Sequence, residues 1–362
     1  MGSFIENNAA PAGIVRPLLV WYGKNARNLP WRKSTDPYRV WISEIMLQQT
    51  RVAAAIDYYE RFLRELPDVR ELAAVPEDRL YKLWQGLGYY SRARNLKKAA
   101  EIIVFERGGV FPDTYEELLQ LPGIGEYTAG AIMSIAYGAP YPAVDGNVLR
   151  VLTRVLGSRR NIAKADTKKW AANLLGQIYP NKDCGSFTQA LMELGALVCL
   201  PGGGADCARC PLKHICIAKK EGVQAELPVK TPPKKRTIEK RTVFLITNGG
   251  RLAIRKRKDG LLGNLWELPS LGRHLRAEEA GQALLQWGIA PQKIGKLPDV
   301  KHVFTHKEWH MLAYSVESGS AAPGFTWARK DELADRYAVP AAFLKYLRLF
   351  LKESSDGRKT GL

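Results

Sequence analysis

The sequence has 362 residues, with 54 Lys and Arg against 36 Asp and Glu, which gives a formal net charge of +18 at pH 7. This length exceeds that of one ordinary hydrophobic core, so we expect two or three domains. The first residues have no basic start, and no run reaches the length of a membrane span, so we expect a soluble protein. We expect a monomer in the cytoplasm. The positive charge favours a polyanionic partner, with nucleic acid as the first candidate. Charge alone does not separate DNA from RNA or from an acidic membrane, and a solvated basic surface is the alternative.

Helical periodicity dominates the chain from about residue 9 to residue 216. Apolar residues recur at helical spacing, and Pro, Gly and Asp residues separate the segments. This pattern predicts an all-α region. The clearest helical segments are 39–63, 93–105, 115–119 and 167–178.

The composition changes after residue 216. Residues 230–241 contain six basic residues, one acid and two adjacent prolines, which indicates a linker. We place this basic linker at 218–239 and expect 353–362 to form a disordered tail.

Short β-like runs characterise the region 240–352. Two of them flank Asn248-Gly249-Gly250, a sequence typical of a hairpin turn, and a helix-like segment lies at 278–288. We therefore predict an α+β domain. Its β-like runs are 242–247, 251–256, 300–305 and 309–316.

Glu44 lies inside the apolar helical run VWISEIML. A carboxyl group among such neighbours is desolvated, which raises its pKa and makes it a candidate general acid near neutral pH. The alternative is that Glu44 faces water on the polar side of an amphipathic helix.

A second acid, Asp145, begins the turn Asp145-Gly146-Asn147 before a helical run. We expect it to cap that helix, where unpaired N–H groups and the helix dipole lower its pKa and keep it ionised. A cap without chemistry is the alternative. One protonated and one ionised carboxyl group are the pair that glycoside-cleaving enzymes use.

The turn Leu121-Pro122-Gly123-Ile124-Gly125 separates two helix-like segments and predicts a helix-hairpin-helix. Gly123 and Gly125 let the backbone approach a DNA strand, and the N–H groups that open the second helix can bind a phosphate without reading sequence. An ordinary turn between helices is the alternative.

Four of the five cysteines are clustered at Cys199, Cys207, Cys210 and Cys216, while Cys184 stands apart as a free thiol. In a reducing cytosol such a cluster predicts metal ligands rather than disulfides. Four thiolates suit zinc or an iron-sulfur cluster, and their spacing alone favours zinc.

His302, His306 and His310 are spaced four apart, which would suggest metal ligands on a helix. Because they fall in and between two predicted strands, we expect them to be polar loop and surface residues.

Five motifs together resemble the helix-hairpin-helix superfamily of DNA glycosylases, and above all the adenine DNA glycosylases of the MutY type. The resemblance runs through nearly the whole chain and rests on the order and distances of the motifs. They are SEIMLQQT at 43–50, GLGYYSRARNL at 86–96, LPGIGEYTAGA at 121–131, AVDGNVLRV at 143–151 and the four-cysteine loop.

This resemblance implies an enzyme that flips adenine, mispaired with 8-oxoguanine or guanine, out of duplex DNA and hydrolyses its N-glycosidic bond. It implies a helical iron-sulfur domain (1–28 and 136–217) and a six-helix domain with the hairpin (29–135). The implied cofactor is a 4Fe-4S cluster on the four cysteines, in place of zinc. The family separates its first two cysteines by six residues, whereas this chain has seven, with three consecutive glycines.

The resemblance also implies roles for individual residues. Glu44 would protonate the adenine, and Asp145 would stabilise the sugar cation or form a covalent adduct before water attacks. Tyr127 and Asn147 would support this geometry. Arg27, Trp31 and Gln189 would line the adenine pocket, while Gln49 and Tyr89, with Thr50 and Leu87 nearby, would fill the gap and contact the opposite base.

Endonuclease III-type enzymes of the same superfamily carry a lysine at the position of Tyr127, where it forms a Schiff base and leads to strand cleavage. Because this chain lacks that amine, we predict a monofunctional enzyme that leaves an abasic site. A glycosylase for thymine or oxidised pyrimidines is the alternative enzyme, and a DNA-binding module without catalysis is the alternative class.

The C-terminal domain resembles the nudix, or MutT-like, fold. GNLWELPS fits it, but the acid-rich metal-binding box of active nudix hydrolases is missing, so we expect no pyrophosphate hydrolysis. In the family this domain recognises 8-oxoguanine through a Phe-Ser-His loop, for which this chain has Phe304-Thr305-His306. Threonine keeps the hydroxyl donor and adds a methyl group.

Overall fold

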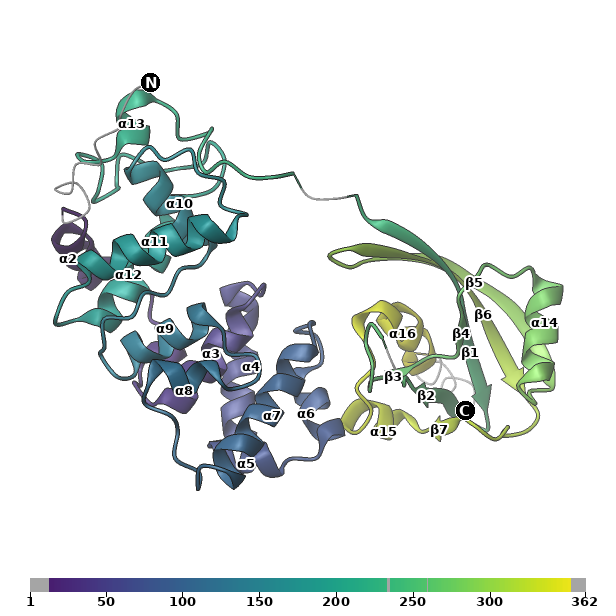
Figure 1. Cartoon of the computed structure of the whole chain (residues 1–362). Helices are drawn as coiled ribbons and strands as arrows, with labels where there is room; N and C mark the ends of the chain where they lie inside the picture. The colour runs from purple at the N-terminus through teal and green to yellow at the C-terminus, as the bar shows by residue number, and fades with distance from the viewer. Residues whose placement is uncertain (1–12, 233–234, 259, 353–362) are drawn as a thin grey trace, which may run out of the picture. The chain divides into compact units, whose positions relative to one another are not determined.

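The computed structural model describes residues 13–232, 235–258 and 260–352, which form two compact units (Figure 1). The first unit contains the described residues up to Ala74 and from Asn95 to Pro232. The second contains Val75–Arg94 and the described residues beyond Pro232. The tail predicted at 353–362 lies outside the described residues.

The first unit is helical, as predicted. The segments predicted at 115–119 and 167–178 are found as α8 and α11. The helices are α2 (Val15–Asn25), α3 (Pro37–Leu47), α4 (Val52–Glu65), α5 (Val69–Ala74), α7 (Ser91–Phe105, which begins in the second unit), α8 (Tyr115–Leu119), α9 (Glu126–Ile135), α10 (Gly146–Val155), α11 (Ala165–Ile178), α12 (Cys184–Leu197) and α13 (Ile217–Glu221), with the 3-10 helix η1 (Pro30–Arg32).

The predicted continuous segment 39–63 is wrong, because two helices divide it. Asp36 caps α3 by accepting a hydrogen bond from the Tyr38 N–H at 2.8 Å. The helix ends at Leu47, and Gln49 follows with a left-handed φ of 57° before α4 starts. A left-handed residue cannot continue a right-handed helix, whereas the apolar periodicity continues across the break and conceals it.

Helix α12 organises the packing of the first unit, since it contacts α2, α9 and α10. Its residues Phe187, Ala190, Leu191 and Leu194 are buried in the core. A close approach also holds α9 in place, because a Cβ added to Gly130 would lie 2.2 Å from the Pro142 carbonyl oxygen. The helices that carry the candidate site residues are therefore fixed by tight contacts.

The second unit is built around one sheet with strand order β3-β2-β1-β6-β5, in which β1 and β6 are parallel. Gly249 and Gly250, both with positive φ, form the predicted hairpin turn between β1 and β2. The strands are β1 (Thr237–Asn248), β2 (Arg251–Lys256), β3 (Trp266–Glu267), β4 (Ser270–Leu271), β5 (Pro291–Val303), β6 (Lys307–Ser318) and β7 (Thr326–Ala328).

Both faces of the sheet are covered. Val243 and Leu245 of β1 pack into a core with residues of α16, whereas Phe244 and Ile246 pack into a core with residues of α14. This alternation follows from the two-residue period of a strand. The helices of the unit are α6 (Glu77–Trp84), α14 (Ala277–Gln286), α15 (Lys330–Asp335) and α16 (Leu344–Lys352), with the 3-10 helix η2 (Ala341–Phe343). The multidomain fold of a helical region followed by an α+β domain is thus confirmed.

Helix α6 belongs to the second unit, although it lies within the predicted domain 29–135. Lys82 Nζ donates to the Leu333 carbonyl at 2.9 Å, and Gln85 Nε2 donates to the Val339 carbonyl at 2.8 Å. These bonds join residues about 250 positions apart, so helical periodicity could not reveal them. The division of the helical region into an iron-sulfur domain and a six-helix domain stays a prediction.

The predicted linker 218–239 begins inside α13 and ends inside β1. Within it, Leu227 is buried, and its carbonyl accepts a hydrogen bond from Arg154 Nε at 2.9 Å. The Val229 carbonyl accepts from the Ile162 N–H at 3.0 Å. The first part of the predicted linker therefore packs on the first unit, through the buried side chain of Leu227 and these two hydrogen bonds.

Membrane-spanning helices are missing from the described parts of the chain: none of the helices there is both long enough and apolar enough.

Replacement of Gly130 by Ala is expected to destabilise the first unit by about 1–3 kcal/mol, because its methyl group overlaps the Pro142 backbone. Gly176→Ala on α11 is the matched control, since a Cβ there meets no atom within 4 Å. We expect the control to be neutral or stabilising by up to about 1 kcal/mol. Urea unfolding followed by circular dichroism measures both, and wild-type stability of Gly130→Ala would contradict the packing described.

Candidate active site

A cavity of about 600 Å³ opens in the first unit among η1, α3, α9, α10 and α12. It brings together both carboxyl groups and most of the catalytic and substrate-binding residues that the sequence indicated. Its lining includes Arg27, Trp31, Glu44, Gln49, Thr50, Tyr127, Asp145, Asn147 and Gln189.

Glu44 is buried in the middle of α3, with 5% of its surface exposed. The expectation of an apolar environment is therefore met, and the alternative of a solvent-facing acid is wrong. Burial raises the pKa of Glu44 to about 7; a hydrogen bond from Tyr127 opposes this rise and the nearby charge of Asp145 adds to it. A carboxyl group with this pKa is largely protonated at slightly acidic pH and about half protonated at neutral pH, so it can act as a general acid there.

Tyr127 of α9 holds the Glu44 carboxyl group. Its hydroxyl donates to Glu44 Oε2 at 2.5 Å and lies 3.9 Å from the Met192 sulfur. Burial raises the pKa of Tyr127 well above its ordinary value, so the hydroxyl keeps its proton and acts as a donor. This bond engages Oε2 of Glu44, and the second carboxyl oxygen, Oε1, takes no part in it.

Asp145 caps α10, as the sequence predicts. Its Oδ1 accepts from the Val148 N–H and its Oδ2 from Asn147 Nδ2, both at 2.7 Å. The predicted lowering of its pKa is wrong, because burial raises the pKa and outweighs these hydrogen bonds. The capping motif is visible in the sequence, whereas the depth of the cavity around it is not.

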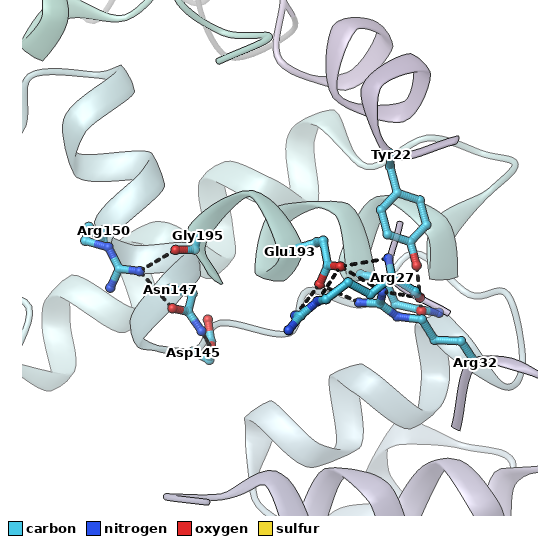
Figure 2. A network of polar contacts seen from close by, with 9 residues as sticks. Tyr22, Arg27, Arg32, Asp145, Asn147, Arg150, Glu193 and Gly195 are labelled. Carbon is cyan, nitrogen blue, oxygen red and sulfur yellow. Dashed lines mark hydrogen bonds and ion pairs between the residues drawn. The ribbon is translucent and has the colours of Figure 1, made fainter. Parts of the chain in front are cut away.

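Arg150 orients Asn147 from outside the cavity (Figure 2). Its Nη2 donates to Asn147 Oδ1 at 2.8 Å and to the Gly195 carbonyl at 2.9 Å, while its Nε donates to the Cys199 carbonyl at 2.8 Å. The amide of Asn147 must therefore direct its Nδ2 group toward Asp145. Sequence reasoning missed Arg150, because an arginine on an amphipathic helix carries no distinguishing signal.

Glu193 anchors two arginines at the other side of the cavity (Figure 2). Its carboxylate accepts from Arg27 Nη2 at 2.6 Å and from Arg32 Nη2 at 2.8 Å. Burial alone would raise the pKa of Glu193, but the bonds from both arginines outweigh it and lower the pKa to about 2. Sequence reasoning also missed this residue, although an acid in the apolar run ALMELGAL has the same signal as Glu44.

The remaining candidate substrate-binding residues lie in the second unit. There the hydroxyls of Tyr89 and Thr305 share a hydrogen bond, and Tyr89 has a left-handed φ of 48°. A separate cavity of about 490 Å³ is lined in part by Leu87, Tyr89, Phe304, Thr305 and His306.

The three spaced histidines occupy strands and a turn, as expected. His302 is paired with Trp309 across β5 and β6, and His310 Nε2 lies 3.2 Å from Glu308 Oε2. In the residues that the structure describes, no group of three or more His, Cys, Asp or Glu side chains could hold a metal ion.

Gly123 and Gly125 lie between α8 and α9. Gly123 has a φ of 81°, and a Cβ there would lie 2.7 Å from the Asn95 Cβ. Gly125 caps α9 and lines a groove with Lys168 and Lys169. The local hairpin agrees with the sequence, and its contact with a DNA phosphate stays a prediction.

The four clustered cysteines form no disulfide, and Cys199, Cys210 and Cys216 pack partly buried against the core of the first unit. Burial raises the pKa of Cys210 to about 11, and the charges of the other three cysteines contribute, which shows that the four lie near one another. Arg154, 1% exposed, donates to Cys199 Sγ at 3.3 Å. The same guanidinium donates to the carbonyls of Leu200 at 2.7 Å and Gly202 at 2.9 Å.

Comparison with known proteins matches residues 42–177 to the HhH-GPD superfamily of base excision DNA repair proteins and residues 242–349 to the NUDIX domain. The chain is 35% identical to the adenine DNA glycosylase of Mus musculus, covering 94% of this chain and 78% of that protein. It is 42% identical to that of Buchnera aphidicola subsp. Schizaphis graminum, covering 83% and 86%. A solved thermostable thymine-DNA glycosylase is 28% identical with a TM-score of 0.55, covering 59% of this chain and 98% of that one.

The single-turnover rate of glycosidic-bond cleavage is expected to fall as the pH rises above 7, by about tenfold for each further pH unit. The reason is that Glu44, with its pKa raised to about 7, must carry its proton to act as the acid. Duplex affinity measured at each pH is the control for lost binding. A rate that stays constant from pH 6 to pH 9 at unchanged affinity would exclude Glu44 as the acid.

Proposed function

The chain belongs to the adenine DNA glycosylases, and we propose that it removes adenine paired with 8-oxoguanine or guanine in duplex DNA. The general activity, that of a DNA glycosylase in base excision repair, follows from relatives that align over most of their length. The observation that carries the proposal is one cavity lined by two carboxyl groups, the buried Glu44 and the partly buried Asp145, and by the amide of Gln189.

The two carboxyl groups divide the chemistry between them. As the bond between the sugar and the adenine breaks, its electron pair stays with the base, and Glu44 supplies the proton that neutralises the departing ring. The sugar then carries an oxocarbenium-like positive charge, which the Asp145 carboxylate stabilises directly or as a covalent adduct. Water adds to the sugar and loses its proton, which leaves an abasic site.

Neighbouring side chains hold each carboxyl group in its role. The hydrogen bond of Tyr127 to Oε2 of Glu44 leaves Oε1 to carry the acidic proton. The bonds from Val148 and Asn147 stabilise the ionised form of Asp145 against its burial. These hydrogen bonds lower the pKa of both carboxyl groups, but burial outweighs them in each case, and it raises the pKa of Glu44 to about 7.

The cavity is suited to a flipped base. Its volume, about 600 Å³, lies within the range of small-molecule sites. Gln189 offers the donor and the acceptor that an adenine edge requires, and Arg27 and Trp31 complete the wall. Extrusion of the base from the stack delivers it to such a pocket.

The second cavity supports recognition of the base opposite adenine. Phe304 and Tyr89 offer aromatic faces, and the hydroxyl of Thr305, bonded to Tyr89, offers the hydrogen-bonding group that serine supplies in the family's loop. Gln49 and Thr50, at the first cavity, would fill the gap that the flipped base leaves. His306 completes the loop.

The presence of a tyrosine at position 127 supports the proposal that the enzyme is monofunctional. A Schiff base requires an amine, and this position holds a phenol whose hydroxyl is already committed to Glu44. We therefore assign the enzyme hydrolysis without strand cleavage.

We also propose that Cys199, Cys207, Cys210 and Cys216 hold a 4Fe-4S cluster. The four thiols lie near one another in the first unit, and four cysteine thiolates are the ligand set of such a cluster. The cluster supplies structural support, because hydrolysis needs no redox step. Arg154 holds the seven-residue segment between Cys199 and Cys207 by donating hydrogen bonds to the carbonyls of Leu200 and Gly202.

Adenine release from duplexes with A opposite 8-oxoguanine, guanine, cytosine and thymine tests the substrate. We expect release to be fastest opposite 8-oxoguanine, with guanine next, and DNA that stays uncut without alkali or heat. Thr305→Ala is expected to reduce the preference for 8-oxoguanine by about tenfold, the value of one hydrogen bond. Thr247→Ala, which loses a hydroxyl bond elsewhere in the second unit, is the control.

Two outcomes would contradict this function. Release of thymine or oxidised pyrimidines in place of adenine would favour the alternative enzyme. Efficient backbone cleavage without alkali would show a lyase and would remove Tyr127 as the distinguishing residue.

Iron and acid-labile sulfide analysis after anaerobic purification tests the cofactor. We expect about four of each per chain and a brown protein with charge-transfer absorption. Arg154→Lys is expected to lower the iron content, because lysine cannot bind the sulfur and the loop carbonyls together, whereas the exposed Arg159→Lys should not. A colourless protein that contains zinc and no iron would show that the spacing-based interpretation was right.

A further inference from the structure

Gln189 is supported by a residue that does not line the active-site cavity. Its Oε1 accepts a hydrogen bond from the Tyr22 hydroxyl at 2.8 Å. Tyr22 lies on α2 and Gln189 on α12, and these helices pack together. Gln189 lines the cavity, whereas Tyr22 does not line it and contacts Gln189 from α2.

We propose that Tyr22 is a positioning residue for base selection, which fixes the carboxamide of Gln189 so that its Nε2 donors and one remaining Oε1 lone pair face the base. The inference rests on the proposed function, in which Gln189 reads the adenine edge. It adds a residue that determines which hydrogen-bonding pattern Gln189 presents.

A flipped amide is disfavoured by the chemistry of the pair. Burial raises the pKa of Tyr22, so its hydroxyl keeps its proton and needs an acceptor. Rotation of the Gln189 amide by half a turn would place the Nε2 donors against that hydroxyl and leave its proton unbound. Because Tyr22 is partly buried, the flipped amide would lose this bond at a place with limited access to water.

Tyr22 is itself held in place (Figure 2). The guanidinium of Arg32 lies over its ring, 5.4 Å from the ring centre. Glu193 fixes that guanidinium through bonds of 3.1 and 2.8 Å. Because Glu193 stands four residues after Gln189 on α12, one helix face carries both the base-reading amide and the anchor of its support.

The fixed amide distinguishes adenine from hypoxanthine. Adenine presents its N6 amino donor beside a ring acceptor, which matches one oxygen and one amino group of a glutamine. Hypoxanthine presents an O6 acceptor in place of the amino donor, so the same amide would face it acceptor to acceptor. A freely rotating amide could adapt to either base.

Tyr22→Phe tests the proposal, because it removes the hydroxyl and keeps the ring under Arg32. Single-turnover release of adenine and of hypoxanthine, each placed opposite the same partner base, gives a selectivity ratio. We expect this ratio to fall about tenfold in Tyr22→Phe, the value of one oriented hydrogen bond. Tyr137→Phe is the matched control, since its hydroxyl donates to the Pro112 carbonyl outside the cavity, and its ratio should equal that of the wild type.

A double-mutant cycle separates positioning from a general structural effect. In a Gln189→Ala background, Tyr22→Phe should leave the ratio unchanged, since no amide remains to be oriented. A wild-type ratio in Tyr22→Phe, or an equal effect in both backgrounds, would overturn the proposal. Failure of the wild-type enzyme to release adenine would instead overturn the proposed function, so the two failures are distinguishable.

Discussion

The burial of the Glu44 carboxyl group is the constraint on which the rest of the site depends. Its place in the middle of α3 raises its pKa from 4.5 to about 7, and the Tyr127 hydroxyl bond ties it to α9. The pKa of Glu44 is higher in the folded protein than in the unfolded chain. The free energy of unfolding therefore falls as the pH rises from 4.5, the unfolded-state pKa, toward 7. Above pH 7 this cost reaches about 3 kcal/mol. The hydrophobic core around α12 must offset this cost. The active site thus lowers the stability of the fold that carries it.

Two polar networks surround this acid and keep the cavity in shape. On one side Arg150 orients Asn147, which in turn bonds Asp145. On the other side Glu193 forms ion pairs with both Arg27 and Arg32. Both networks satisfy buried polar groups with charged partners, so removal of one member would leave another uncompensated. Side chains that are held in this way keep the two carboxyl groups in position to act on a bond of the substrate.

The sequence was sufficient where local chemistry decides the outcome. An acid in an apolar helical run marked Glu44, a cap motif marked Asp145, and the glycine pair 249–250 marked a hairpin. It was insufficient where distant segments decide it. The pKa of Asp145 depends on burial by other helices, the break at Gln49 is hidden by continuous periodicity, and α6 joins the sheet domain through bonds across about 250 residues. The support that Tyr22 and Glu193 give the cavity likewise needs the packed structure.

The most direct measurement of the central claim compares Glu44→Gln with the wild type in single-turnover adenine release and in duplex affinity. Glutamine keeps the size of the side chain and an acceptor for Tyr127 but has no acidic proton to give. We expect a loss of about 10²- to 10⁴-fold in the rate of release with affinity retained. Release at the wild-type rate would show that Glu44 is not the acid that protonates the base.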